Sequence, residues 1–357
     1  MRSDIPAEDL ADDITAKVTI DQRMIPVDDG HELFVRRIGP ALPSDLAPVV
    51  CCNGVGVSTF FYEPLERALR HRRRVLRWDY RGHGRSAPMT DPKTLTIEQT
   101  AEDLRAVLDD ARIDRAVLVG HSMGCQVIME FERRHPDRVA GLIPMLGTHG
   151  RPLDTFFSAP IFTKVAFRAL FEVANRKPHW LNDGNALAMG NPWFRSLAGR
   201  LAGLSGVVNG GLMPAPMIDA YLHHMARLDA RVFFNMCRWM AFHSVEDHLE
   251  QVAAPTLVVA GTHDYFTPLW LSEEMADRVP GAELLVVPGG SHAALVEQPE
   301  LVNLRIEAFL DKRVDAPRSD HTDSSREETG GAVTAARGAR SRPPSPSPST
   351  SKASQGV

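Results

Sequence analysis

The sequence predicts an α/β protein with a mostly parallel sheet, helices on both faces and an inserted helical segment. Strand-like apolar runs alternate with helical stretches over residues 16–150, and the alternation resumes over residues 247–313. Between them, residues 151–246 lose the strand pattern and become helical and rich in aromatic side chains. Repeated strand–helix units favour parallel strands, because each parallel neighbour is reached through a crossover connection.

The first region begins with a predicted hairpin. Residues 16–27 and 32–38 read as strands on either side of the turn sequence Asp28-Asp29-Gly30. The elements expected next are a strand at 48–52, a helix at 60–70, a strand at 74–79, a helix at 96–111, a strand at 116–119, a helix at 123–134 and a strand at 139–146. The helix at 96–111 carries its apolar residues at the spacing of one buried face: Ile97, Ala101, Leu104, Val107 and Leu108.

The second region repeats the pattern and then gives way to a polar tail. Strands are expected at 255–260 and 283–287, with a helix at 269–279 between them and a closing helix at 299–312. Residues 314–357 lack aromatic side chains and end in a run rich in serine and proline. Such a segment cannot bury enough apolar surface to offset the entropy of ordering it, so a disordered tail is predicted. Residues 1–15 are expected to be a flexible N-terminus.

Composition limits the classes of function. The chain has 357 residues, 43% of them hydrophobic, and a formal net charge of −5. This length suits one large domain with an insertion or two domains, and the mild negative charge gives no reason to expect a nucleic-acid partner. The acidic N-terminus lacks the apolar core of a signal peptide, and no apolar stretch approaches the ~20 residues of a membrane span. We therefore expect a cytoplasmic protein without a membrane span.

The cysteines do not indicate a metal or redox site. The chain has four of them, Cys51, Cys52, Cys125 and Cys237, and no CxxC pair. Neither a zinc site nor a thioredoxin-like motif is therefore supported. We expect buried thiols, and no metal or cofactor.

One serine lies in the sequence context of a nucleophile. Gly120-His121-Ser122-Met123-Gly124 fits the pattern G-x-S-x-G and lies between a predicted strand and a predicted helix. A sharp turn at this point would present the Ser122 hydroxyl at the top of the sheet, and the flanking glycines would leave room for it. An ordinary strand–helix turn is the alternative, and the strand–motif–helix order favours the nucleophile.

A serine nucleophile needs a neighbouring base. His292 follows the predicted strand at 283–287 and so lies at the carboxyl edge of the sheet, where ligand and catalytic groups gather in open α/β sheets. His83, His121 and His263 lie in loops at the same edge and are weaker candidates. The His121 side chain is expected to diverge from the serine hydroxyl.

The predicted acid that orients this histidine is Asp264, which follows the strand at 255–260. The order Ser122, Asp264, His292 is the chain order of the triad in one known hydrolase fold. Asp154 is the runner-up, because some proteins of that fold carry the acid after the preceding strand. However, Asp154 lies beyond Pro152, and no carboxylate ends the strand at 139–146.

The backbone of two loops is predicted to supply an oxyanion hole. The Met123 N–H directly follows the nucleophile, and the Val55 N–H lies in the loop after the strand at 48–52. That loop, residues 54–59, also supports a rival interpretation as a dinucleotide fingerprint, with Asp79 as the acid that binds the ribose. Thr59 occupies the position of its third glycine, and a dinucleotide fold leaves the serine, aspartate and histidine unexplained.

Together these motifs resemble the α/β-hydrolase superfamily, and more narrowly its esterase, lactonase and carbon–carbon-bond hydrolase branch. The resemblance covers residues 16–313 and rests on these segments: Asn53-Gly54, Asp79-Tyr80-Arg81-Gly82-His83-Gly84-Arg85-Ser86, residues 120–124, Gly261-Thr262-His263-Asp264 and Gly290-Ser291-His292. It implies a catalytic triad of Ser122, Asp264 and His292, and a cap domain at residues 151–246. The chain departs from the family at Asn53, where members commonly have histidine.

The resemblance implies a cofactor-independent serine hydrolase that cleaves an ester, lactone or thioester bond through an acyl-enzyme. A carbon–carbon hydrolase, a lyase or a perhydrolase with the same triad is the alternative, and so is a receptor with negligible turnover. Part of the aromatic set of the helical segment is expected to line the roof of a pocket for a small apolar substrate. The set comprises Phe156, Phe157, Phe162, Phe167, Phe171, Trp180, Trp193, Phe194, Phe233, Phe234, Trp239 and Phe242.

Overall fold

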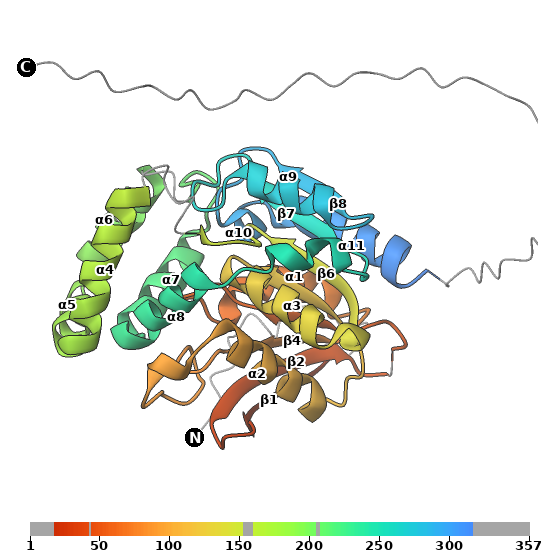
Figure 1. The fold of residues 1–357 in the computed structure, drawn as a ribbon, viewed down its shortest axis with the longest axis horizontal. Helices are drawn as coiled ribbons and strands as arrows, with labels where there is room; N and C mark the ends of the chain where they lie inside the picture. The colour runs from red at the N-terminus through yellow and green to blue at the C-terminus, as the bar shows by residue number, and fades with distance from the viewer. Residues whose placement is uncertain (1–17, 43, 153–159, 205–207, 317–357) are drawn as a thin grey trace, which may run out of the picture. The chain divides into compact units, whose positions relative to one another are not determined.

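The computed structural model describes residues 18–42, 44–152, 160–204 and 208–316. These residues contain an eight-stranded sheet in the order β1-β2-β4-β3-β5-β6-β7-β8 (Figure 1). Its strands are β1 (Val18–Pro26), β2 (Glu32–Pro40), β3 (Val49–Cys52), β4 (Val75–Trp78), β5 (Ala116–His121), β6 (Val139–Met145), β7 (Leu257–Gly261) and β8 (Glu283–Val287). The hairpin β1–β2 is antiparallel, β2 pairs antiparallel with β4, and the strands in the order β4-β3-β5-β6-β7-β8 are parallel. The predicted mostly parallel sheet is confirmed.

Helices cover both faces, because successive side chains of a strand point to opposite sides of the sheet. One layer contains α2 (Ile97–Asp110), α3 (Met123–Arg134) and α9 (Leu269–Arg278), and the other contains α1 (Glu63–Leu69), α10 (Ala294–Glu297) and α11 (Pro299–Phe309). In β3, Val50 and Cys52 belong to the core on the α2–α3 side, whereas Val49 and Cys51 belong to the core on the α1–α11 side. All four cysteines are buried free thiols, as expected.

Local sequence explains where these helices begin. All five predicted apolar positions of α2 are buried, and the Thr96 hydroxyl caps its first turn by accepting a hydrogen bond from the Gln99 N–H at 3.0 Å. The helix expected at residues 60–70 is divided into a 3₁₀ turn, η2 (Thr59–Tyr62), followed by α1. Pro64 lies in the first turn of α1, where its missing N–H costs no helical hydrogen bond.

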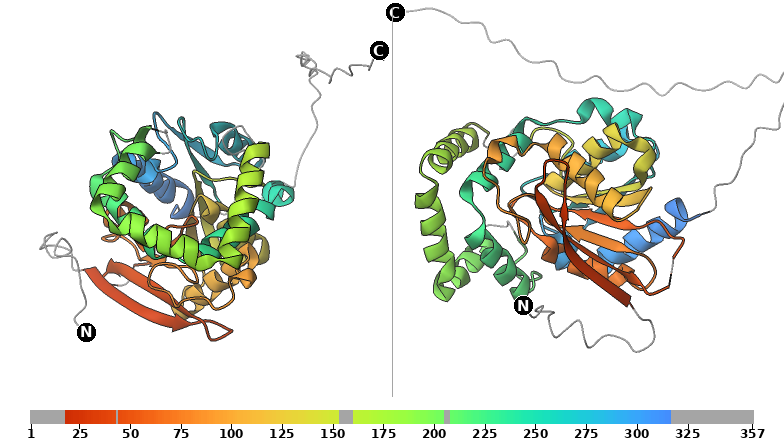
Figure 2. Two further views of the ribbon diagram at one scale, coloured as in Figure 1. Left: turned by 90° about the vertical axis from the view of Figure 1, so that its left-hand side faces the viewer. Right: turned by 90° about the horizontal axis from the view of Figure 1, so that it is seen from below.

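The insertion between β6 and β7 is helical in the described residues. It contains α4 (Pro160–Arg176), α5 (Pro178–Gly190), α6 (Pro192–Leu204), α7 (Ala215–Arg227) and α8 (Ala230–Phe242), all within the predicted helical segment 151–246. Figures 1 and 2 show these helices grouped together to one side of the sheet. No helix in the described ranges is long and apolar enough to cross a membrane.

The folded region continues past the expected boundary at residue 313. A π-helical turn, η8 (Leu310–Val314), follows α11, and the Asp315 N–H donates to the Leu310 carbonyl at 2.9 Å. The Asp315 carboxylate also pairs at 2.5 Å with Arg73, whose side chain is only 1% exposed. The expectation that the tail begins at residue 314 is therefore wrong, because a buried arginine is paired with Asp315. The flexible N-terminus predicted at 1–15 and the tail from residue 317 lie outside the described residues.

Candidate active site

A tight turn between β5 and α3 presents the Ser122 hydroxyl. Ser122 has φ 55° and ψ −118°, a conformation that residues other than glycine rarely adopt. Its N–H donates to the Met145 carbonyl at 3.0 Å. A Cβ at Gly120 would lie 2.4 Å from the Gly124 oxygen, and a Cβ at Gly124 would lie 2.2 Å from the Cys52 oxygen. Only glycine fits at these two positions, so the motif and its strained turn depend on each other.

The structure brings the three predicted residues Ser122, His292 and Asp264 together. His292 Nε2 lies 2.9 Å from Ser122 Oγ, and His292 Nδ1 lies 2.8 Å from Asp264 Oδ2. The residues follow β5, β8 and β7, whose carboxyl ends meet at one edge of the sheet. With Nδ1–H donating to the carboxylate, Nε2 is free to accept the serine proton. The arrangement can therefore activate the hydroxyl as a nucleophile.

Asp264 is held as an ionised acceptor. Its Oδ1 accepts the backbone N–H groups of Phe266 and Thr267, both at 2.9 Å, and its Oδ2 accepts the Thr267 hydroxyl at 2.7 Å. Burial alone would raise the pKa of Asp264, but the charge and hydrogen bond of His292 and the bonds from Thr267 outweigh burial, so the pKa lies below its ordinary value. The runner-up, Asp154, lies outside the described residues.

The two residues predicted to supply an oxyanion hole lie beside the turn that carries Ser122. Met123 is the first residue of α3, and Val55 lies in the loop after β3. Within the described ranges, neither N–H donates to a protein acceptor. Val55 lines the same cavity as Ser122, and a Cβ at the adjacent Gly54 would lie 3.1 Å from Ser122 Cβ. Both amides are therefore available close to the serine.

Asn53, at the position where the family resemblance led us to expect histidine, keeps the loop after β3 in place. Its Nδ2 donates to the Trp78 carbonyl at 2.8 Å, and its carbonyl accepts the Tyr80 hydroxyl at 2.9 Å. Both partners belong to β4 or directly follow it. The amide side chain is therefore directed toward the sheet, and the departure from the family pattern leaves the loop anchored.

His83 supports this loop through hydrogen bonds to the backbone. It is 1% exposed; its Nε2 accepts the Gly56 N–H at 3.3 Å, while Nδ1 lies 3.1 Å from the Arg81 carbonyl. Gly56 has φ +71°, which favours glycine. Burial lowers the pKa of His83 to about 4, so the ring is neutral and can both donate and accept. His83 was a weaker candidate for the base, and this placement agrees with that ranking. In the sequence, only the motif at residues 79–86 pointed to a role for His83 in the loop.

The carboxylate of Asp79 accepts hydrogen bonds from three groups of the protein itself. Its Oδ1 accepts the Ser58 hydroxyl at 2.6 Å and the Thr59 N–H at 2.9 Å, and its Oδ2 accepts the Arg85 N–H at 2.9 Å. The residue is fully buried. The dinucleotide alternative requires this carboxylate to bind a ribose. Here it instead ties the loop after β3 to the loop after β4.

His121 contacts His292, the predicted base. Its Nε2 lies 2.8 Å from the His292 carbonyl oxygen, and its ring centroid lies 4.4 Å from that of Phe61. Burial, assisted by the charge of His292, lowers the pKa of His121 to about 3. A neutral imidazole with its proton on Nε2 donates to this carbonyl, so His121 steadies the backbone of His292.

Glu297 is a site residue that the sequence analysis missed. Its carboxylate accepts the Ser291 N–H at 3.0 Å, the Ser291 hydroxyl at 2.5 Å and the Asn209 N–H at 2.7 Å. Glu297 is 6% exposed and follows Ala294-Leu295-Val296, all of them buried. In the sequence, the signal that could have identified Glu297 was a single acid at the end of an apolar run. Such a carboxylate is buried with the run and therefore requires hydrogen-bond partners.

A cavity of about 350 Å³, here called the inner pocket, opens over Ser122 and His292. This volume is near the lower end for small-molecule sites. Its lining is mostly apolar, and its polar side chains are those of Ser122, His292, His121 and Tyr221. The loops after β3 and β7 contribute Val55, Val57, Phe60, Phe61 and Phe266, and the helical insertion contributes Met213, Met217, Ile218, Leu222, Phe233 and Met240.

The expected aromatic roof is mainly aliphatic and sulfur-containing. Of the predicted aromatic set, only Phe233 lines the inner pocket among the described side chains. Trp180 and Trp193 are each 65% exposed, and Phe242 is 66% exposed. Helical spacing identifies one face of a helix but not which face the neighbouring layer covers, and here methionines of α7 and α8 lie over the serine.

Comparisons with known proteins agree with this fold. Residues 49–304 match the model of the alpha/beta hydrolase family. A relative from Caulobacter sp. (strain K31) named "Putative carbamate hydrolase RutD" is 30% identical over 276 residues, which cover 76% of this chain and 92% of the relative. Among solved structures, an enol-lactonase from Burkholderia xenovorans LB400 has a TM-score of 0.66 at 22% identity and covers 81% of this chain and 100% of its own. A thermophilic esterase from Thermogutta terrifontis has a TM-score of 0.64 at 22% identity, covering 82% of this chain and 99% of its own.

The fold and the matched residues define an α/β hydrolase. The chain belongs to the alpha/beta hydrolase family, whose model spans β3 to α11. The resemblance identified from the motifs is therefore confirmed. The solved structures, at 22% identity, support the fold alone.

Proposed function

We propose that this protein is a serine hydrolase that cleaves an ester, lactone or thioester bond of a small apolar substrate through an acyl-enzyme. The observation that carries the proposal is the continuous hydrogen-bonded series from Ser122 Oγ through His292 to Asp264. The apolar inner pocket over the same serine supports an apolar acyl or ring group.

The proposed reaction begins when Ser122 Oγ attacks the substrate carbonyl while its proton passes to His292 Nε2. Asp264 stabilises the resulting imidazolium. The Val55 and Met123 N–H groups would donate to the carbonyl oxygen as it becomes negative. His292 then protonates the leaving alcohol or thiol. Water, deprotonated by the same histidine, hydrolyses the acyl-enzyme and restores Ser122.

A carbamate is the second candidate substrate. The relative from Caulobacter carries carbamate hydrolase in its name and is 30% identical over 76% of this chain. In a carbamate ester the same serine can attack the carbonyl and expel the alcohol, which His292 protonates, leaving a carbamoyl group on Ser122. Water then releases carbamic acid, which breaks down to an amine and carbon dioxide. Ester and carbamate hydrolysis therefore use the same residues and differ in the group that Ser122 holds.

Other reactions remain alternatives to hydrolysis. A carbon–carbon hydrolase, a lyase or a perhydrolase could use the same serine and histidine, and a receptor could retain the pocket with negligible turnover. A panel of short 4-nitrophenyl esters, lactones, thioesters and carbamates separates these classes. A receptor would show ligand binding without release of nitrophenolate, and a lyase would convert its own substrate without consuming water.

Ser122→Ala tests the proposal directly. Hydrolysis should fall by about 10⁴-fold or more, and labelling by a fluorophosphonate probe should disappear, because the probe requires an activated serine. Ser44→Ala is the control, since Ser44 lies in the loop between β2 and β3 and its hydroxyl donates to the Arg72 carbonyl. The assignment of Ser122 is wrong if labelling persists in Ser122→Ala.

A further inference from the structure

Two connections join the helical insertion to the core, and they lie side by side. The first, residues 146–152, follows β6, and the second, residues 243–245, follows α8. The Val245 N–H donates to the His149 carbonyl at 2.9 Å, which ties the connections to each other. Leu146, where the first connection begins, has φ 49°, a strained conformation for a residue other than glycine. The position of the insertion therefore depends on what holds this pair of connections.

Gln126 of α3 binds both connections. Its Nε2 lies 3.1 Å from each of three carbonyl oxygens, those of Gly150, Met240 and His243. Gly150 belongs to the first connection, His243 to the second, and Met240 to the last turn of α8. The last carbonyls of a helix have no partner within the helix, so the Gln126 amide also caps α8. One side chain thus holds the base of the insertion at three points.

The Gln126 side chain is held through its donors. The residue is fully buried, and within the described ranges its Oε1 has no hydrogen-bond partner. A buried amide oxygen without a partner lowers stability, and an apolar side chain of similar size would avoid this effect. That apolar side chain would leave the three carbonyls without their donor. The amide at this position is therefore explained by its bonds to the base of the insertion.

Glu130 adds a second link on the same face of α3. It lies four residues after Gln126, about one helical turn further along. Its Oε2 lies 3.2 Å from His243 Nε2, and the Glu130 and His243 side chains are only 5% and 7% exposed. Helix α3 therefore holds the second connection through both the backbone and the side chain of His243.

The helix that Gln126 caps forms part of the roof of the inner pocket, meaning the part of the insertion that lines the pocket opposite the core. Phe233, Cys237 and Met240 of α8 line this pocket together with Ser122. Because α3 begins directly after Ser122, the same helix positions the nucleophile and, through Gln126, the roof. A change in the Gln126 bonds would shift α8 relative to Ser122.

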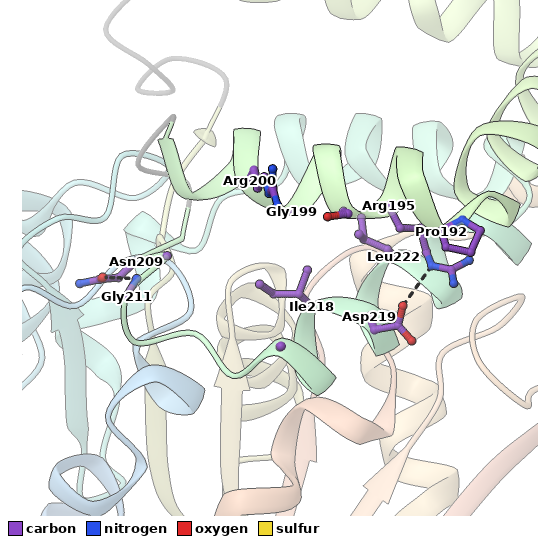
Figure 3. Close-up of a pocket in the computed structure, with 12 residues that line it drawn as sticks. Pro192, Arg195, Gly199, Arg200, Asn209, Gly211, Ile218, Asp219 and Leu222 are labelled. Carbon is purple, nitrogen blue, oxygen red and sulfur yellow. Dashed lines mark hydrogen bonds and ion pairs between the residues drawn. The ribbon is translucent and has the colours of Figure 1, made fainter.

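Another part of the roof is less closely packed. Figure 3 shows α6 and α7 on either side of a cavity of about 900 Å³. An ion pair between Arg195 Nε and Asp219 Oδ1, 3.0 Å apart, joins the two helices. The Asp219 side chain is 66% exposed, and a pair in such a setting contributes little to stability. Packing between α6 and α7 therefore fixes the roof less firmly than the buried attachment of α8 to α3.

We propose that Gln126 is a positioning residue that fixes the roof of the inner pocket relative to Ser122 and thereby sets the preference for apolar acyl groups longer than acetyl. The proposal rests on the proposed function, because it assumes that Ser122 attacks an acyl carbonyl. An acetyl group is small and makes few contacts with the roof. A longer chain fills the pocket and contacts α8, so its binding depends on where Gln126 holds that helix.

Gln126→Met tests the proposal, because methionine is similar in size and cannot donate these hydrogen bonds. The kcat/KM for 4-nitrophenyl hexanoate should fall by about 10-fold or more through a higher KM, whereas that for 4-nitrophenyl acetate should change by less than about 3-fold. Asn303→Leu is the matched control, since the Asn303 Nδ2 donates to the Pro64 carbonyl at 3.1 Å and links α11 to α1 on the other face of the sheet. This control should keep the parental ratio of the two substrates.

Amide hydrogen exchange measures the attachment of the insertion without any substrate. In Gln126→Met, the amides of residues 147–152 and 240–245 should exchange faster than in the parent, and Val245, which donates to His149, is the main reporter. The amides of β3 and β5 should exchange as in the parent. His243→Phe keeps a ring but loses the bond to Glu130, so it should cause a smaller change of the same kind, and it replaces Gln126→Met if that variant does not fold.

The results separate this proposal from the proposed function. Failure of fluorophosphonate to label the parent would reject the serine hydrolase, while hydrogen exchange would still test the attachment. A folded, labelled Gln126→Met with the parental ratio of hexanoate to acetate turnover, or with parental exchange at Val245, would overturn the positioning role. An equal change of the ratio in Asn303→Leu would also overturn it, because the effect would then follow from lower stability in general.

Discussion

The carboxylate of Glu297 accepts hydrogen bonds from both the backbone N–H and the hydroxyl of Ser291, the residue that precedes His292. The same carboxylate accepts the N–H of Asn209, and Asn209 Nδ2 donates to the Gly289 carbonyl at 3.1 Å. The loop that carries the proposed base is therefore tied on one side to α10 and on the other to the segment between α6 and α7. The Glu297 carboxylate therefore contacts the residue next to His292, and no hydrogen bond between it and Ser122 or His292 is present in the described residues.

Replacing Glu297 should impair turnover through His292. In Glu297→Ala, the Ser291 and Asn209 donors lose a shared acceptor, so the imidazole is less well positioned and kcat should fall by up to about 100-fold. Glu297→Gln should recover part of the loss, because its amide oxygen can accept some of these bonds. Activity is expressed per fluorophosphonate-reactive site, and thermal melting is measured in parallel. An unchanged kcat per reactive site with a lower Tm would show that Glu297 serves stability alone.

Asp264→Asn should lower kcat by about 10⁴-fold with little change in stability. The NH₂ group of the new asparagine can donate a hydrogen bond to His292 Nδ1. This favours the imidazole tautomer that has its proton on Nε2, and that nitrogen then cannot accept the Ser122 proton. Asp137→Asn, at an exposed aspartate after α3, is the matched control and should retain full activity. The assignment to Asp264 fails if its variant stays near parental activity while Asp154→Asn loses it.

Stability should decline as the pH falls from about 6.5 to about 4. Burial lowers the pKa of His83 and of His224 to about 4 and, with the charge of His292, that of His121 to about 3. The unfolded chain protonates such groups near pH 6.5, so in this window it binds more protons than the folded chain. The free energy of unfolding therefore decreases with falling pH, by up to about 1.4 kcal/mol per pH unit for each histidine.

Urea unfolding between about pH 7 and pH 5 measures this dependence. His83→Asn removes one of the three groups and should make the slope of unfolding free energy against pH shallower. His179→Asn, at an exposed histidine of α5, should leave the slope as in the parent. A parental slope in His83→Asn would mean that the pKa of His83 in the folded protein is close to its ordinary value.

A chain that ends at residue 316 should match the full-length protein in Tm and turnover, because from its composition the remaining tail has no apolar pattern to dock. A chain that ends at Arg313 should be less stable by about 1.5–3 kcal/mol, the usual value of a hydrogen bond to a charged group. It lacks Asp315, the partner of Arg73, and leaves the buried guanidinium with the Ala47 carbonyl, 3.0 Å away. Chemical unfolding of the three chains decides the boundary, and equal stabilities would show that the Arg73 pair is dispensable.

The sequence by itself determined the features that depend on local pattern. The apolar spacing within α2 and the strand–turn–helix context of Ser122 are encoded by neighbouring residues, and each has the same form in the structure. His292 and Asp264 could be placed at one sheet edge because both follow strands of a parallel sheet, whose carboxyl ends coincide.

Only the tertiary structure decided which distant groups meet. Arg73 and Asp315 are 242 positions apart, and Glu297 and Asn209 are 88 apart, so no local periodicity relates them. The lining of the inner pocket also depended on how the helices α5 to α8 orient their faces, which placed methionines over Ser122 and left Trp180 and Trp193 exposed. A buried polar group needs hydrogen-bond partners, and buried apolar side chains need close packing. Which residues meet these needs depends on how the layers of the fold pack against one another.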